Sequence, residues 1–202
     1  FTTSTNDQAI TLSNTSNALT GAVTVSSQGT SGNVTIDNGT TALGVQGTAN
    51  GNLVLISGEV ITDSAALTVS GTTTVTTDVA DKAITLGTLA STGDVSLNSS
   101  GTTGNAVVNN TTTALGLAAS SIGGTLTAET DNSITVKGTV TSKGVTSLSA
   151  SDDVIFAAAG ALASTNGNIT VTADDDNTPT GTGGAMTMAN GATINSGTGT
   201  IT

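Results

Sequence analysis

The sequence predicts an all-β chain that winds into a right-handed parallel β-helix, also called a β-solenoid. Three observations predict this fold: a long internal repeat, short strands of alternating apolar and polar residues, and very few aromatic side chains, 1% of 202 residues. A sandwich of this size fills the gap between its sheets with aromatic side chains, whereas stacked coils are filled by small apolar ones. Frequent Val, Ile and Thr and a mean hydropathy of +0.18 indicate an ordered chain.

The internal repeat appears as two matching series of short runs. The glycines Gly21 and Gly93 open matching strands, and the run Thr-Ala-Leu-Gly begins at Thr41 and again at Thr113, so that both pairs share one offset in numbering. A weaker third copy begins at Asp153. A sandwich does not restart its own strand order in this way, whereas stacked coils can.

Short strands are expected along the whole chain, because apolar and polar residues alternate with a period of two. Thr is the usual outward residue, since it is polar and β-branched. Asn-Gly, Ser-Gly and Thr-Gly pairs between the strands predict turns. In chain order, the expected strands lie at 9–12, 22–25, 34–36, 53–56, 67–69, 84–86, 95–97, 126–127, 134–136, 169–171, 186–188 and 200–202.

The strand spacing predicts coils of roughly 20–25 residues, so that one repeat would hold three coils and the chain about eight or nine. Residues 1–202 are expected to form a single β-solenoid segment without separate domains. The repeat also predicts that Ile10, Ile84 and Phe156 face inward at equivalent places, because each follows an aspartate at the same short spacing.

The two ends of the chain carry no sequence signal for a cap. Phe1 to Asn6 forms a short polar lead, and residues 199–202 stop within an expected strand. Unpaired strand edges and exposed apolar cross-sections favour association. We therefore expect either an excerpt of a longer repetitive chain or a filament subunit that self-associates end to end.

The charged residues exclude several classes of site and partner. The chain has no Cys, His or Arg, and three lysines, Lys82, Lys137 and Lys143, against 14 acidic residues give a net charge of −11. Ser–His–Asp, Cys–His and the usual zinc sites are therefore impossible. A nucleic-acid partner is not expected from so acidic a chain. No apolar run approaches the ~18 residues of a membrane span, so membrane insertion is not expected either.

One stretch interrupts the strand rhythm. Residues 173–184, between Val171 and Met186, contain Pro179, the only proline, and are expected to protrude from a corner as an insertion. The insertion also contains Asp174, Asp175 and Asp176, and carboxylates are ligands that Ca²⁺ prefers. A calcium loop at these three residues and a solvated acidic corner are the two interpretations. No other cofactor is expected.

The last part of the chain resembles a known class of protein. The residues from Asn166 to Asp176, from Gly184 to Ile194 and from Gly197 to Thr202 are similar to the filamentous haemagglutinin-type β-strand repeats of giant bacterial surface proteins. The resemblance implies a secreted, extracellular rod at the cell surface, used in adhesion, biofilm or filament assembly. It implies no catalytic residues.

We expect from this a structural segment of a secreted bacterial surface fibre or adhesin and not an enzyme. Its expected partners are other copies of the chain and the glycans or proteins of a host or neighbouring cell. The alternative is a carbohydrate-processing enzyme on the same β-helix fold. Such an enzyme would need a carboxylate pair, for which only the clusters at Asp152, Asp153 and Asp174 to Asp176 offer side chains.

Overall fold

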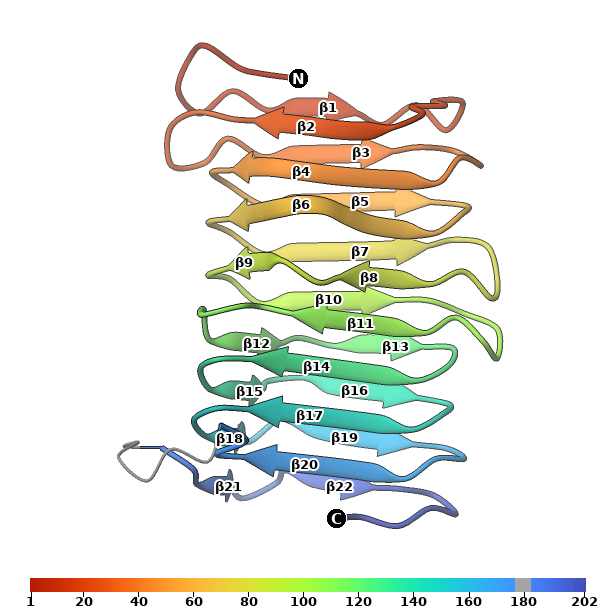
Figure 1. Cartoon of the computed structure of the whole chain (residues 1–202), viewed down its shortest axis with the longest axis vertical. Helices are drawn as coiled ribbons and strands as arrows, with labels where there is room; N and C mark the ends of the chain where they lie inside the picture. The colour runs from red at the N-terminus through yellow and green to blue at the C-terminus, as the bar shows by residue number, and fades with distance from the viewer. Residues whose placement is uncertain (177–182) are drawn as a thin grey trace.

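In the computed structural model the chain forms a rod of stacked parallel strands, with the N-terminus at one end and the last coil at the other (Figure 1). The structure describes residues 1–176 and 183–202, and no helix occurs among them. The front strands in Figure 1 run right to left and the rear strands left to right as the chain descends. The winding is therefore right-handed, as predicted.

Two sheets run the length of the rod. The front sheet contains β2 (Ala22–Ser26), β4 (Leu43–Ala49), β6 (Ile61–Val69), β8 (Ile84–Leu86), β9 (Leu89–Ser91), β11 (Ala106–Asn109), β14 (Leu126–Thr130), β17 (Thr146–Ala150) and β20 (Ile169–Ala173).

The rear sheet is built from the remaining strands of the described residues. They are β1 (Ile10–Leu12), β3 (Val34–Asp37), β5 (Leu53–Ser57), β7 (Thr73–Thr77), β10 (Val95–Asn98), β12 (Leu115–Leu117), β13 (Ser120–Ile122), β15 (Ile134–Val136), β16 (Thr139–Ser142), β18 (Val154–Phe156), β19 (Ala161–Ser164), β21 (Met186–Met188) and β22 (Thr193–Asn195).

The register fixes the length of each coil. The pairing of Ile10 with Val34 spans the longest of the regular coils, and the pairing of Leu43 with Ile61 spans the shortest. The last coil is the exception, since Val154 pairs with Met186 and the whole insertion lies between them. The rod has about seven turns, close to the eight or nine coils expected, and this long last coil accounts for part of the difference.

The repeat spans three and a half coils, and not the three predicted. Each half turn carries the chain from one sheet to the other, and three and a half coils contain an odd number of half turns. The next repeat therefore begins on the opposite sheet. Ile10 and Phe156 accordingly lie in the rear sheet and Ile84 in the front sheet, although all three are buried as predicted. The three residues therefore face inward at equivalent positions of the repeat, and the half turn places Ile84 in the opposite sheet from the other two.

At some places in each sheet, one strand pairs with two short strands in the next coil. In the first repeat the front strand β6 pairs with two short strands, β8 and β9, in the next coil. In the second repeat the rear strand β10 pairs with β12 and β13. The division continues in the rear sheet, where β15 and β16 and then β18 and β19 follow as pairs of short strands.

The interior is a continuous column of small apolar side chains. Leu, Ile and Val side chains such as Ile36, Leu55 and Leu97 are fully buried, and Phe156 is the largest of this set. Two fully buried threonines lie in the column, and both are hydrogen-bonded: Thr73 Oγ1 lies 3.0 Å from Ser91 Oγ, and Thr146 Oγ1 lies 2.6 Å from Ser142 Oγ. In the described part of the chain, every buried polar side-chain atom has a partner.

The N-terminal lead adds to the ladder. The amino group of Phe1 donates to the Thr24 carbonyl at 2.6 Å, Ser26 N donates to the Phe1 carbonyl, and Thr3 N donates to the Ser26 carbonyl. The lead is therefore paired along β2 and is not a free polar tail. Its alternation is too short to predict this pairing from sequence.

The described residues of the predicted insertion lie between β20 and β21, except Ala173, which is the last residue of β20. The insertion makes the last coil longer than the others, as the pairing of Val154 with Met186 shows. Pro179 lies outside the described residues.

Candidate functional site

The acidic corner after β20 is the first candidate site. Asp174 has a left-handed backbone, with φ of 61°, and its N–H donates to the Asp152 carbonyl at 3.1 Å. The Asp175 carboxylate accepts hydrogen bonds from the hydroxyls of Ser149 and Ser151 in the coil above, the second at 3.1 Å. Both carboxylate oxygens of Asp175 are therefore hydrogen-bonded to neighbouring serines.

The structure does not bring the predicted calcium ligands together. Within residues 1–176 and 183–202, no group of three or more Asp or Glu side chains is placed to hold a metal ion. Asp176 has an interaction of its own in the structure. Calcium at Asp174, Asp175 and Asp176 stays a prediction.

The second acidic cluster lies beside the first. Asp153 accepts a hydrogen bond from Ala185 N at 2.9 Å, and its own N–H donates to Ser133 Oγ at 3.3 Å. Asp152 is joined to Asp174 through the backbone bond described above. The residues named for the alternative enzyme thus share one corner, and the bonds of Asp153 and Asp175 there stabilise loop backbone and side chains.

A turn built on an aspartate recurs in both repeats. Asp7 and Asp81 have φ of 62° and 65°. Asp81 Oδ1 accepts from the N–H groups of Thr103 at 2.8 Å and Thr102 at 2.6 Å, and these bonds lower the pKa of Asp81. The pKa of Asp7 is lowered in the same way by the N–H groups at Ser31 and Thr30. The sequence repeat contains these aspartates but does not reveal their role.

A buried asparagine also recurs, at Asn38 and Asn110, and sequence reasoning missed both. Their side chains are 0% exposed. Asn110 Oδ1 accepts from Ser91 N at 2.8 Å, and its Nδ2 donates to three carbonyl oxygens. Asn38 makes the same four bonds one repeat earlier. Their identical spacing within the repeat was the available signal.

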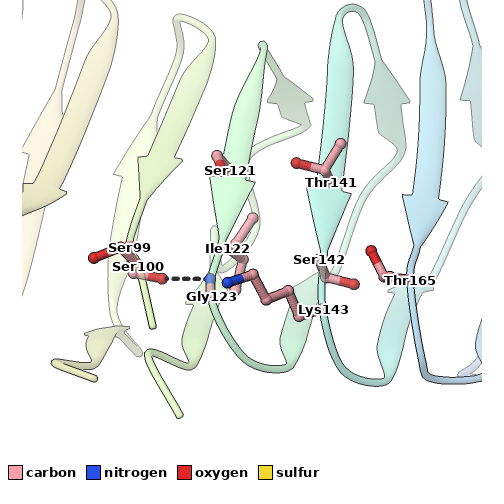
Figure 2. Close-up of a pocket in the computed structure, with 9 residues that line it drawn as sticks. All are labelled: Ser99, Ser100, Ser121, Ile122, Gly123, Thr141, Ser142, Lys143 and Thr165. Carbon is pink, nitrogen blue, oxygen red and sulfur yellow. Dashed lines mark hydrogen bonds between the residues drawn. The ribbon is translucent and has the colours of Figure 1, made fainter. Parts of the chain in front are cut away.

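A pocket of about 210 Å³ opens where β10, β13, β16 and β19 end. Figure 2 shows its lining side chains, which come from four successive coils. The floor contains the buried residues Ser99, Ile122 and Ser142. The rim is formed by exposed or half-exposed residues: Ser100, Ser121, Thr141, Lys143 and Thr165.

Lys143 differs from the other two lysines. Lys82 pairs with Glu59 at 2.7 Å, and Lys137 pairs with Asp94 at 2.5 Å. Lys143 Nζ instead donates to the Gly101 carbonyl at 2.7 Å, two coils away. Its side chain extends across the pocket in Figure 2, so its charge lies at the pocket and has no carboxylate partner among the described residues.

The matching corner of the first repeat has different residues. The bond from Thr165 N to the Ser142 carbonyl corresponds to the bond from Thr92 N to the Val69 carbonyl, which places Ser70 where the second repeat has Lys143. Asn50 occupies the position of Gly123, and its Nδ2 donates to the Ser27 carbonyl at 2.8 Å. The positive charge of Lys143 therefore has no counterpart at the matching corner of the first repeat.

Comparison with known proteins gives one match. The model of a family described as repeats of unknown function (DUF5649) matches residues 31–98 and 103–163, more than half of the chain. The matched segments begin at equivalent positions of the two repeats and contain β3 and β11 as their first strands, which lie in opposite sheets. No curated protein and no solved structure matches the chain. The resemblance to filamentous haemagglutinin-type proteins stays a prediction.

Among the residues that the structure describes, no helix is long and apolar enough to cross a membrane.

Proposed function

We propose, since the chain belongs to the family of repeats of unknown function (DUF5649), that its solenoid is a structural segment of a secreted bacterial surface fibre or adhesin. The rod would act through its length and rigidity at the extracellular face of the cell. Adhesion, biofilm formation or filament assembly would then depend on surfaces displayed along it.

One observation carries this proposal: the second repeat continues the first without a break in the ladder or the core. The front sheet passes from β6 to β8 and on to β11, each in parallel register. Buried side chains continue through the same junction, at Ile61, Ile84 and Ala106. A unit that stacks on its neighbour in this way lengthens the rod with every copy, by about 17 Å for three and a half coils at ~4.8 Å each.

Contact with a second copy of the chain is part of the proposal. β1 and β21 end the path of the rear sheet, and each pairs there on one edge only. Met186 and Met188 of β21 are 48% and 45% exposed, so the last coil presents an apolar face. We expect β21 of one copy to pair with β1 of the next, and a head-to-tail contact of this kind propagates into a filament.

Sedimentation tests this contact. The mean mass of the chain should rise with protein concentration, and Met188→Glu should reduce the rise, because it places a charge on the apolar face. Val60→Glu is the control, since Val60 is also exposed, at 39%, but lies on the side of the rod. A monomer at all concentrations would contradict the proposed contact.

Gene replacement in the bacterium that carries the chain tests the main proposal against the enzyme. Deleting the gene should remove surface labelling by an antibody against the rod, and should reduce adhesion. The variant Asp153→Ala with Asp174→Ala should restore both if the chain is structural. Failure of a folded double variant to restore adhesion, together with glycan turnover by the unmodified chain alone, would support the carbohydrate-processing enzyme instead.

A further inference from the structure

We propose that the pocket at the ends of β10, β13, β16 and β19 binds an oxyanion, a carboxylate or sulfate group, with Lys143 supplying the positive charge. The proposal is independent of the role of the rod, which needs no ligand. It rests on the charge of Lys143, on the free hydroxyls around it and on the difference between the two repeats.

The first argument is the unusual pairing of Lys143. The chain has 14 acidic residues and three lysines, and the other two lysines each pair with a carboxylate. Lys143 donates to the Gly101 carbonyl, which uses one of its three N–H donors. Two donors remain available to a ligand in the pocket.

The second argument is the hydroxyl groups on the rim. The side chains of Ser100, Ser121 and Thr165 are exposed and make no hydrogen bond within the described part of the chain. A hydroxyl can donate to an oxyanion, and hydrogen bonds to a charged group are stronger than neutral ones. No acidic side chain is among the residues that line the pocket.

The third argument concerns the chemistry of the ligand. The pocket contains no aromatic side chain on which a sugar ring could stack, so a neutral saccharide would lack its usual platform. Charge and hydrogen bonds are what the pocket offers, and both favour an oxyanion, either free or carried on an acidic saccharide. The carboxylate of Asp81 lies close to Gly101 and opposes binding, so we expect a dissociation constant on the order of 1 mM.

The first repeat provides an internal comparison. Its corner has Ser70 in place of Lys143, and the Ser70 carbonyl accepts a hydrogen bond from Thr92 Oγ1 at 2.9 Å. The hydroxyl that corresponds to Thr165 is thus already occupied there. A ligand that needs the lysine and the free hydroxyls should bind at the second repeat and not at the first.

The test is a titration of the ¹⁵N-labelled chain, followed by amide chemical shifts. Sodium glucuronate and sodium sulfate are the two probes, and glucose is the neutral control. Both probes should shift the amides of Ser100, Ser121, Gly123 and Thr165, while the corner at Ser70 stays unchanged. A larger shift with glucuronate would indicate a saccharide source, and equal shifts would indicate a free oxyanion.

Two variants make the test specific. Lys143→Met keeps the aliphatic chain and should weaken binding at least about tenfold, the loss expected for hydrogen bonds to a charged group. Lys137→Met removes the same charge from a lysine already paired with Asp94, and should leave binding unchanged. If Lys143→Met does not fold, Ser121→Ala with Thr165→Ala replaces it and should also weaken binding.

Equal weakening by Lys143→Met and Lys137→Met would show a non-specific effect of charge and would overturn the proposal. The absence of localised shifts with either probe at about 50 mM, well above the expected dissociation constant, would overturn it too.

Discussion

Replacing Asn110 with alanine should lower the free energy of unfolding by about 3–4 kcal/mol, because the buried side chain makes four hydrogen bonds, two of them fully buried. Its Oδ1 accepts from Ser91 N at 2.8 Å, and its Nδ2 donates to the carbonyls of Ser91, Thr113 and Ala114 at 2.9–3.0 Å. Ser91 is itself 0% exposed, so alanine leaves its N–H without an acceptor, at about 1–3 kcal/mol. The unpaired carbonyls and the space left by the amide account for the rest.

Two further asparagines show whether this reasoning is correct. Asn38→Ala removes the same four bonds, but its partner Leu19 is half-exposed and water can replace the amide, so we expect a loss of about 2 kcal/mol. Asn52→Ala is the matched control. Asn52 is exposed, its side chain accepts one bond from Thr72 N, and its loss should be at most about 1 kcal/mol.

Urea unfolding followed by circular dichroism gives these free energies by linear extrapolation. Because stacked repeats can unfold in parts, amide hydrogen exchange at Ser91 should be measured as well, and should become faster in Asn110→Ala. Asn110→Asp should be worse than alanine at pH 7, since it turns a carboxylate towards three carbonyl oxygens. The reasoning is refuted if Asn110→Ala is no more destabilising than Asn52→Ala.

Three other predictions concern the core, a turn and acid stability. Phe156→Ala should cost about 3–5 kcal/mol and lower the melting temperature, because the ring is fully buried. Gly101→Ala should cost at least about 1–2 kcal/mol in urea unfolding, since Gly101 has φ of 88° and a Cβ would lie 2.2 Å from Asp81 Oδ1; Gly87→Ala, with its nearest atom at 4.0 Å, should be neutral. The pKa values of Asp7 and Asp81 are lowered from 3.8, so the folded chain binds fewer protons than the unfolded chain around this pH. Their stabilisation is present above pH 3.8 and is lost progressively as the pH falls from there through the lower pKa values of the folded chain. The urea midpoint of Asp7→Asn with Asp81→Asn should therefore fall less between pH 7 and pH 3 than that of the unmodified chain.

Many strands and their inward faces could be predicted from the sequence, because alternation of apolar and polar residues determines which side chains a coil buries. Other strands, such as β4, β12 and β17, were not expected, and the strand expected at 200–202 is only an isolated bridge between Ile201 and Ile169. Ile10, Ile84 and Phe156 are buried as expected. The face on which each lies could not be predicted. It depends on the length of the chain at each corner, and a small difference per coil changes three coils per repeat into three and a half.

The polar features were harder to predict than the strands. Asn38 precedes Gly39, so the sequence indicates a turn there, and Gly39 does have φ of 55°. The Asn38 side chain bonds to the nearby carbonyls of Thr41 and Ala42, but also to the N–H and carbonyl of Leu19 in the preceding coil, and no local pattern reveals that contact. The position of Lys143 at a pocket could not be predicted from the sequence either, because residues from four coils form that pocket.

The half turn in each repeat has a consequence for how such genes change length. Loss or duplication of one repeat unit would rotate every later coil by about half a turn relative to the earlier ones. A loop or pocket such as that of Lys143 would then face the opposite side of the rod, with no change in its own residues. Gain or loss of two units would preserve all orientations, so the parity of the copy number determines which surfaces share a side.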